Sequence, residues 1–297
     1  MRIASLVTNG RPFLGVRAPT GDAFVDVSSL LESAPRDLGA FLRTSKAERE
    51  MLERVVRDAR ELETRARVAV KDVTYRPLLG GGKVLCLGLN YVDHANESPY
   101  EPPKYPVLFA RFATSFVGHE QPIVRPSLST HFDYEAELVV FIGRTGRNIP
   151  RDRALEHVAG YSLMNDGSIR DYQMRTPQWT IGKNFDRTGS LGPELVTPDE
   201  LPEGARGLRL RGLLNGKVMQ EATTAHMIFD VAHTIALLSE ALTLEVGDAI
   251  AMGTPGGVGF VRKPPVFLTP GDVFEVDVER LGTLRNRVVD QSELEKS

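Results

Sequence analysis

HFDYEAELVVFIG, which runs from His131 to Gly143, joins an acidic head to an apolar tail. Its residues 138–142 are continuously apolar, which predicts a strand buried on both faces. Because side chains alternate along a strand, Glu135 and Glu137 point to the same face, and Val139 and Phe141 continue that face as an apolar surface. The stretch therefore predicts a central strand that carries two carboxylates at one end.

Two interpretations of this acidic pair remain open from the strand alone. The strand end can emerge into solvent, where carboxylates are normally found. Alternatively, both carboxylates stay at the edge of a buried face, repel each other, and need a shared cation or a raised pKa. Asp166, which ends the apolar run GYSLMND (160–166), adds a third acid and favours a cation. Three carboxylates form a hard oxygen site that suits Mg²⁺ or Mn²⁺ better than Zn²⁺.

The bulk composition is that of a chain with a substantial core and balanced charge. Its 297 residues are 41% hydrophobic, the formal net charge is -3, and Cys86 is the single cysteine. We therefore expect one large domain plus a smaller one, no affinity for nucleic acid or an anionic membrane, and no internal disulfide. The N-terminus lacks a signal-peptide pattern and no apolar run is long enough to cross a bilayer, so we expect a soluble, cytoplasmic protein.

The order of patterns along the chain predicts an α+β fold. Residues 1–35 contain hairpin signals such as NG, and residues from about 36 to 70 have a helical pattern. YRPLLGGGK (75–83) separates a small N-terminal domain at 1–75 from a large domain at 80–290. Strands and helices do not alternate regularly after this point, which favours a mixed sheet over a doubly wound parallel sheet.

Five motifs in a fixed order make the large domain specific. They are LNYVDHANE (89–97), DYEAELVVFIG (133–143), GYSLMNDGSIRDYQ (160–173), QWTIGKNFD (178–186) and MGTPGGVGF (252–260). This series resembles the fumarylacetoacetate hydrolase family over residues 80–290, and the small N-terminal domain resembles that of shorter family members, the acylpyruvate hydrolases and 2-hydroxyhepta-2,4-diene-1,7-dioate isomerases. The resemblance implies a mixed β-roll or sandwich with flanking helices, a homodimer, and Mg²⁺, with Mn²⁺ or Ca²⁺ as substitutes.

The resemblance also implies a set of site residues. The metal ligands would be Glu135, Glu137 and Asp166, which would answer why two acids lead a buried strand. It also places a catalytic dyad on His94 and Glu97 and an active-site lysine on Lys183. The implied substrate-binding residues are Arg170, Gln173, Gly253 and Thr254.

Elementary chemistry gives each of these residues a role and an alternative. His94 and Glu97 are three residues apart, so on a helical turn the carboxylate could contact the imidazole. Such a contact would orient the imidazole and raise its basicity. The alternative is an ordinary polar loop, because DHANESPYEPPKY (93–105) is rich in proline, and the same composition favours a lid that orders over ligand. A desolvated Lys183 would stabilise developing negative charge, whereas the alternative is a surface lysine.

Arg170 and the residues near it leave further alternatives. Arg170 could hold a substrate carboxylate in a two-pronged contact, or could form a structural ion pair with its neighbour Asp171. The glycines of MGTPGGVGF would let backbone N–H groups approach an oxyanion or carboxylate, although a tight turn after a strand gives the same pattern. Four more residues are candidates to shape the pocket: Arg111, Phe112, Phe116 and Trp179.

The function implied by the resemblance is hydrolysis of a carbon–carbon bond in an acylpyruvate or a related 2,4-diketo acid, through a metal-bound pyruvate enolate. His94, oriented by Glu97, would activate the attacking water. An oxaloacetate-type decarboxylase, a hydroxymuconate-type isomerase or a related lyase would use the same metal site. The resemblance also implies a part in the breakdown of aromatic compounds. A non-catalytic binding protein on the same fold is the remaining alternative, against which the intact acids, dyad and lysine argue.

Overall fold

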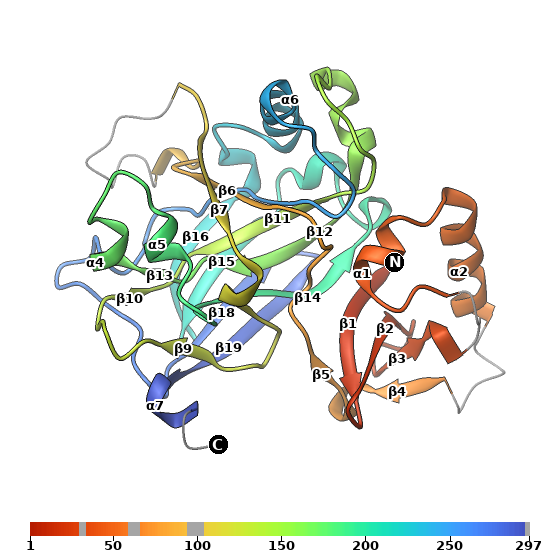
Figure 1. Ribbon diagram of the computed structural model, residues 1–297, viewed down its shortest axis with the longest axis horizontal. Coiled ribbons are helices and arrows are strands. Elements are labelled where there is room, and N and C mark those ends of the chain that lie inside the picture. The colour runs from red at the N-terminus through yellow and green to blue at the C-terminus, as the bar shows by residue number, and fades with distance from the viewer. Residues whose placement is uncertain (30–33, 59–65, 94–103, 295–297) are drawn as a thin grey trace.

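The computed structural model describes residues 1–29, 34–58, 66–93 and 104–294. Over these residues the chain forms α+β structure with few helices, as the sequence predicts. The described helices are α1 (Leu38–Leu42), α2 (Lys46–Asp58), α4 (Arg170–Gln173), α5 (Thr180–Lys183), α6 (Val231–Ala241) and α7 (Gln291–Leu294). Figure 1 shows α1 and α2 at one end of the molecule and α4 and α5 at the other.

The strands of the described residues form three sheets. The largest has the order β4 (Arg67–Ala69), β3 (Ala23–Asp26), β2 (Arg11–Arg17), β1 (Arg2–Thr8), β14 (Gly189–Val196), β12 (Val158–Asn165), β11 (Ala136–Ile142), β17 (Ala249–Ala251), β6 (Val84–Gly88) and β7 (Val107–Arg111), with β5 (Thr74–Tyr75) on β1 and β8 (Phe116–Val117) on β14. The second has the order β16 (Lys217–Thr223), β15 (Arg209–Leu214), β18 (Val273–Val278), β19 (Gly282–Asp290) and β9 (Ile123–Arg125), and the third pairs β10 (Phe132–Asp133) with β13 (Ser168–Ile169).

Strand β11 lies between the two main cores. Every residue of β11 is buried, which confirms the predicted strand. Its side chains at 138, 140 and 142 face the core shared with the second sheet, which packs against β11, β12 and β14. Val139 and Phe141 face the other core, which contains Cys86 and also N-terminal residues such as Leu14 and Phe41. Because Glu135 and Glu137 share the side of Val139 and Phe141, the acids lie at the edge of this second core.

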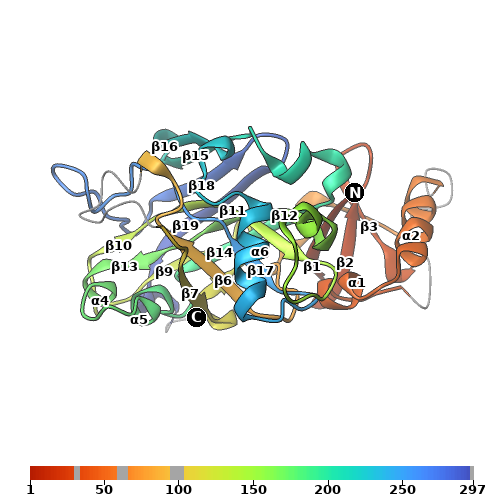
Figure 2. The ribbon, with the colours of Figure 1, turned by 90° about the horizontal axis from the view of Figure 1, so that it is seen from above.

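The N-terminal strands join the large sheet through β1, which pairs antiparallel with β14. Figure 2 shows these strands continuing past the central strands of the sheet. The proposed boundary near residues 75–80 therefore falls between segments that share one sheet, and the division into two domains stays a prediction.

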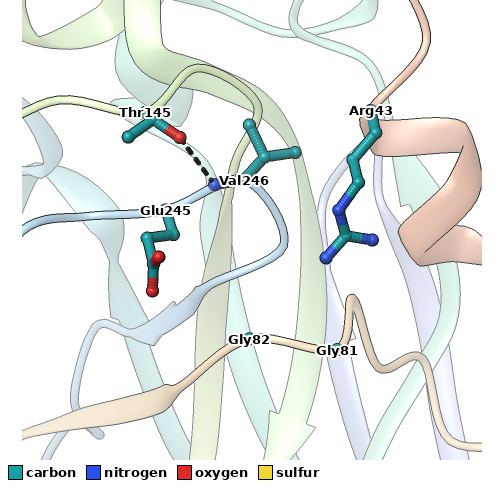
Figure 3. A pocket seen from close by; sticks show the side chains of 6 residues that line it. All are labelled: Arg43, Gly81, Gly82, Thr145, Glu245 and Val246. Carbon is teal, nitrogen blue, oxygen red and sulfur yellow. Dashed lines mark hydrogen bonds between the residues drawn. The ribbon is translucent and has the colours of Figure 1, made fainter.

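A cavity of about 430 Å³ lies at this junction, near the residues that follow β11 and so at the opposite end of that strand from the two glutamates. It is lined by Arg43, Gly81, Gly82, Thr145, Glu245 and Val246. Figure 3 shows Arg43 on one side of the cavity and Glu245 on the other, with Val246 N donating to Thr145 Oγ1 at 3.3 Å. None of the residues predicted for the site lines this cavity.

Candidate active site

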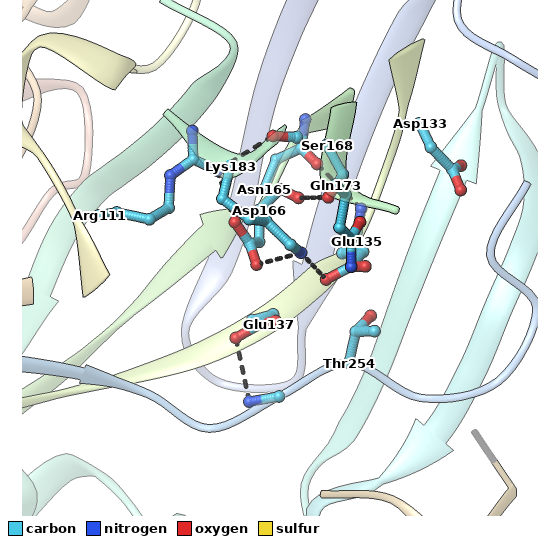
Figure 4. A network of polar contacts seen from close by, with 12 residues as sticks. Arg111, Asp133, Glu135, Glu137, Asn165, Asp166, Ser168, Gln173, Lys183 and Thr254 are labelled. Carbon is cyan, nitrogen blue, oxygen red and sulfur yellow. Dashed lines mark hydrogen bonds and ion pairs between the residues drawn. The ribbon is translucent and has the colours of Figure 1, made fainter. Parts of the chain in front are cut away.

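The three predicted acids meet where β11 begins and β12 ends. Ala136 lies opposite Asn165 in the antiparallel ladder, so Glu135 and Glu137 flank the end of β12, and Asp166 follows it directly. Asp166 N donates to Glu135 O at 2.9 Å, which fixes the backbone between them. One carboxylate oxygen from each acid lies within 4.8 Å of the other two, and all three side chains are buried (Figure 4). We call Glu135, Glu137 and Asp166 the acid triad.

Glu137 has the most unfavourable surroundings for a charge within the acid triad. Burial, reinforced by the nearby charges of Asp166 and Glu135, raises the pKa of Glu137 well above its ordinary value of 4.5. Its Oε2 accepts a 3.0 Å hydrogen bond from Gly253 N, and no cationic side chain pairs with it among the described residues. A buried carboxylate beside two others, without its own cation, is the setting in which an additional cation is stabilising.

Lys183 is a cation that contacts two members of the acid triad. It ends α5, and its side chain is only 2% exposed, which excludes an ordinary surface lysine. Its Nζ lies 2.8 Å from Glu135 Oε2 and 2.7 Å from Asp166 Oδ2. Burial lowers the pKa of Lys183, but Asp166 and Glu135 outweigh it and the pKa is raised above 10.5. Lys183 is therefore an ammonium at neutral pH and a hydrogen-bond donor.

Arg170 is held by two other acids, not by its neighbour in the sequence. Its Nε lies 2.8 Å from Asp133 Oδ2 and its Nη1 lies 2.7 Å from Glu135 Oε1. Asp171 instead accepts a hydrogen bond from Ser129 Oγ at 2.6 Å, so the ion pair considered between Arg170 and Asp171 is not formed. Arg170 Nη2 is buried and has no hydrogen-bond partner among the described residues.

Gln173 and the glycine-rich loop complete the described part of the site. Gln173 Oε1 accepts from Arg170 Nη1 at 2.8 Å, so its amide orients the guanidinium. Gly253 has a φ of 83°, a left-handed conformation that favours glycine, and this turn aims its N–H at Glu137. Thr254 Oγ1 donates to Ala136 O at 3.0 Å, so this hydroxyl is used to attach the loop to β11.

Sequence reasoning missed two residues that hold this loop in place. Asp133 accepts from Gly259 N at 2.8 Å and from Phe260 N at 3.0 Å, besides pairing with Arg170. Gln220 Nε2 donates to Thr254 Oγ1 and to Pro255 O, both at 2.8 Å, while its Oε1 accepts from Ala136 N. The spacing of Asp133 two residues before Glu135 was an available signal, whereas nothing in the sequence near Gln220 indicated its role.

Two predicted catalytic residues cannot be placed. His94 and Glu97 fall in 94–103, outside the described residues, and so does most of the predicted lid. The chain can be followed to Asp93, and Asn90 just before it is buried and bonds to Phe229 and Met252. The dyad therefore stays a prediction.

The donor set of the acid triad fits a divalent cation. Three carboxylates at mutual distances within 4.8 Å offer hard oxygen ligands, and Glu137 contributes a buried acid with no cationic partner in the described chain. Asp133, Glu135, Glu137 and Asp166 face the cations Arg111, Arg170 and Lys183, so a formal count leaves one negative charge in excess. A divalent ion would reverse that excess and leave the site attractive to an anionic ligand.

Comparison with known proteins agrees with this geometry. The family described as "Fumarylacetoacetate (FAA) hydrolase C-terminal" matches residues 83–289. The chain is 38% identical over 280 residues to the human protein named oxaloacetate tautomerase FAHD2A, mitochondrial, covering 94% of this chain and 88% of that one.

Two solved structures share the fold over nearly the whole chain. Fumarylacetoacetate hydrolase from Exiguobacterium antarcticum superposes with a TM-score of 0.81 at 34% identity, covering 98% of this chain and 100% of the other. Maleylpyruvate hydrolase from Sphingobium sp. SYK-6, in complex with manganese (II) ion and pyruvate, superposes with a TM-score of 0.79 at 26% identity, covering 98% and 99%.

Proposed function

The chain belongs to the fumarylacetoacetate hydrolase family and is a metal-dependent enzyme of that family, and from this premise we propose that it acts on 2-oxo acids through their enol forms. The first activity that we propose is tautomerisation of oxaloacetate, the reaction named for the human relative. The observation that carries the proposal is the buried acid triad with Lys183 reaching two of its three members.

No helix among the described residues is long and apolar enough to cross a membrane.

The described residues supply what enolisation needs. In this reaction a proton leaves carbon 3 of the keto form, a double bond forms between carbons 2 and 3, and the carbonyl oxygen gains a proton. A divalent cation, when bound by the acid triad, would polarise that carbonyl. The Lys183 ammonium would donate a hydrogen bond to the oxygen on which negative charge develops. The buried Arg170 Nη2 is suited to one substrate carboxylate.

His94 is the base that the sequence offers for the proton on carbon 3. Its proposed orientation by Glu97 would keep the imidazole in one tautomer and raise its basicity. Lys183 is less suited to this step, because the acids that raise its pKa keep it protonated. A His94→Ala variant that keeps full activity would exclude the histidine as the base.

A second candidate is hydrolysis of an acylpyruvate, favoured by the similarity to a maleylpyruvate hydrolase whose structure contains manganese and pyruvate. Here a water activated by His94 would attack the distal carbonyl, and the bond to carbon 3 would break. The products would be a free acid and pyruvate, which leaves as its enol and takes a proton on carbon 3. Both candidates require stabilisation of a 2-oxo acid enolate, of oxaloacetate in the first and of pyruvate in the second, and they differ in whether an attacking water is used.

The experiment that separates them starts from the enol form of oxaloacetate and follows its ultraviolet absorbance in the presence of Mg²⁺ or Mn²⁺. We expect faster conversion than in a protein-free control, and loss of the acceleration in Glu137→Gln. Glu194→Gln is the matched control, because Glu194 is also a buried acid on the large sheet but pairs with Arg17 away from the acid triad. Wild-type conversion at the protein-free rate would exclude the tautomerase.

Acetylpyruvate and fumarylpyruvate, assayed for pyruvate release, test the hydrolase with the same variants. Release of carbon dioxide from oxaloacetate faster than in a protein-free control with the same metal ion would indicate the decarboxylase instead. If wild type releases pyruvate and Glu137→Gln does not, hydrolysis would be the main activity. If neither acetylpyruvate nor fumarylpyruvate yields pyruvate, acylpyruvate hydrolysis would be excluded.

We extend the proposal to Mg²⁺ as the working ion with Mn²⁺ or Ca²⁺ as substitutes, to a homodimer, to cytoplasmic localisation, and to a part in the breakdown of aromatic compounds. The hard oxygen ligands of the acid triad support the choice of ion. Light scattering tests the assembly, because a particle of 32.7 kDa would contradict the dimer.

A further inference from the structure

Arg111, the last residue of β7, places its guanidinium directly behind the acid triad. Its Nη1 lies 2.5 Å from Asp166 Oδ1, and both side chains are fully buried. The same Nη1 donates to Gly167 O at 3.2 Å, so it contacts the side chain of Asp166 and the backbone of the next residue. Arg111 was a candidate to line the pocket, but these contacts put it on the far side of a predicted metal ligand.

The guanidinium is fixed on its other edges as well. Nε donates to Ser115 Oγ at 3.2 Å, and Nη2 donates to Thr188 Oγ1 at 3.2 Å. The guanidinium carbon lies 4.8 Å from the centre of the Phe116 ring. Gly189 leaves room for it, because a Cβ at that position would lie 2.6 Å from Nη2. An arginine held by this many partners has little rotamer freedom left to lose.

This arrangement divides the two oxygens of Asp166 between two tasks. Oδ1 is occupied by Arg111, while Oδ2 lies on the inner side, where Lys183 Nζ also reaches Glu135 Oε2. A carboxylate can bind a cation through one oxygen or through both. With Oδ1 held from behind, Asp166 presents a single oxygen in a fixed direction.

We propose that Arg111 is a positioning residue that fixes Asp166 as a one-oxygen ligand of the divalent cation. This inference rests on the proposed metal dependence and adds a residue that the predicted ligand set does not contain. Residues that hydrogen-bond to a metal-ligating carboxylate and orient it commonly contribute roughly 10- to 100-fold to metal affinity. The competing explanation is that Arg111 only neutralises a buried acid, which would require its charge but not its orientation.

Two variants disturb the orientation in different ways. Gly189→Ala keeps Arg111 and its charge but places a Cβ where the guanidinium now lies, and the far end of a side chain can shift to make room. Arg111→Lys keeps the charge but loses the fork that spans Asp166, Ser115 and Thr188. The control is Gly15→Ala on β2, away from the acid triad, where the Cβ would lie 2.6 Å from the end of the Leu6 side chain.

The Kd for Mn²⁺ is measured by isothermal titration calorimetry on the full chain. The electron paramagnetic resonance spectrum of the bound ion is recorded as well. We expect Gly189→Ala and Arg111→Lys to weaken binding by about 10-fold or more and to change the spectrum, with Gly15→Ala within about twofold of wild type. A folded Gly189→Ala or Arg111→Lys protein with the wild-type Kd would overturn the positioning role. A wild-type protein that binds no Mn²⁺ would instead overturn the metal site itself, and this role with it.

Discussion

Glu137 is the member of the acid triad whose surroundings most disfavour the charged form of the side chain. Because its pKa is raised by burial and by Asp166 and Glu135, the metal-free folded protein keeps this proton at pH values where the unfolded chain has released it. Stability is therefore unaffected below the ordinary value of 4.5 and falls as pH rises from there toward the raised folded value. Glu137→Gln removes this titration, so with a chelator present its Tm should gain on wild type as the pH rises above the ordinary value of 4.5.

The comparison variant for this pH series is again Glu194→Gln. Glu194 forms a buried ion pair with Arg17, so removing its charge should lower the Tm at neutral pH, since the arginine loses its partner. A difference in Tm between Glu137→Gln and wild type that stays constant across the pH series would contradict the assigned cause.

At the residue scale, the sequence predicts identities better than contacts. Glu135, Glu137 and Asp166 were found because two strand ends carried acids where apolar residues continued the pattern, and the structure brings them together. The partners of Arg170 could not be found this way, because Asp133 reaches it across β10 and β13, whereas Asp171 is only adjacent in the chain. Sequence neighbours point to different sides of a short element, and the fold decides which acid is within reach.

At the scale of elements, Gln220 of β16 fastens the glycine-rich loop to the head of β11. Gln220→Leu would leave Ala136 N, Thr254 Oγ1 and Pro255 O without this partner in a buried region. Each unsatisfied buried group costs about 1–3 kcal/mol, so we expect the free energy of unfolding to fall by at least that amount. Urea denaturation measures the change.

Glu221 provides the matched position, because it is the next residue on β16 and is exposed. Glu221→Leu should change the free energy of unfolding by no more than about 0.5 kcal/mol. Equal effects of the two substitutions would mean that the loop is held by other contacts.

Elements whose signals are local were the ones that the sequence predicted well. Asn9 and Gly10 both have positive φ, 47° and 75°, and form the tight turn between β1 and β2 that NG indicates. In GDVFEVDVE (271–279), apolar and polar residues alternate as in a strand, and its residues Val273–Val278 form β18 with every second side chain buried. The apolar stretch HMIFDVAHTIALLSEAL (226–242) is typical of a helix, but α6 begins only at Val231, where Asp230 caps it through His233 N. The contacts of Arg111 could not be predicted in this way, because its hydrogen-bond partners come from η3 (Ala113–Ser115) and from the residues before β14.

At the scale of the whole molecule, a bound divalent cation should stabilise the fold. A ligand at 100 times its Kd adds about 2.7 kcal/mol to the free energy of unfolding, if it binds only the folded state. We expect Mn²⁺ and Mg²⁺ to raise the Tm of wild type, a chelator to reverse the shift, and Glu137→Gln to show none. A shift of equal size in Glu137→Gln would place the ion elsewhere.

The fold class followed from the irregular order of strands and helices, and the family followed from five motifs in series. The joining of the N-terminal strands to the large sheet did not follow, because pairing between β1 and β14 depends on edges that meet only in three dimensions. A composition break such as YRPLLGGGK marks a change of local pattern and carries no information on whether strands on its two sides pair.

That pairing has a consequence for synthesis on the ribosome. Arg2 lies opposite Val196 in the ladder, so this end of the β1 edge has no strand to receive it until residue 196 has been added, although β5 can pair with Leu6 and Val7 earlier. At about 5–20 residues per second, the N-terminal hairpin waits roughly 10 to 40 s after it emerges. During that interval the open end of the edge can pair with another nascent chain, so we expect a chaperone that covers the first 17 residues to raise the yield of folded protein.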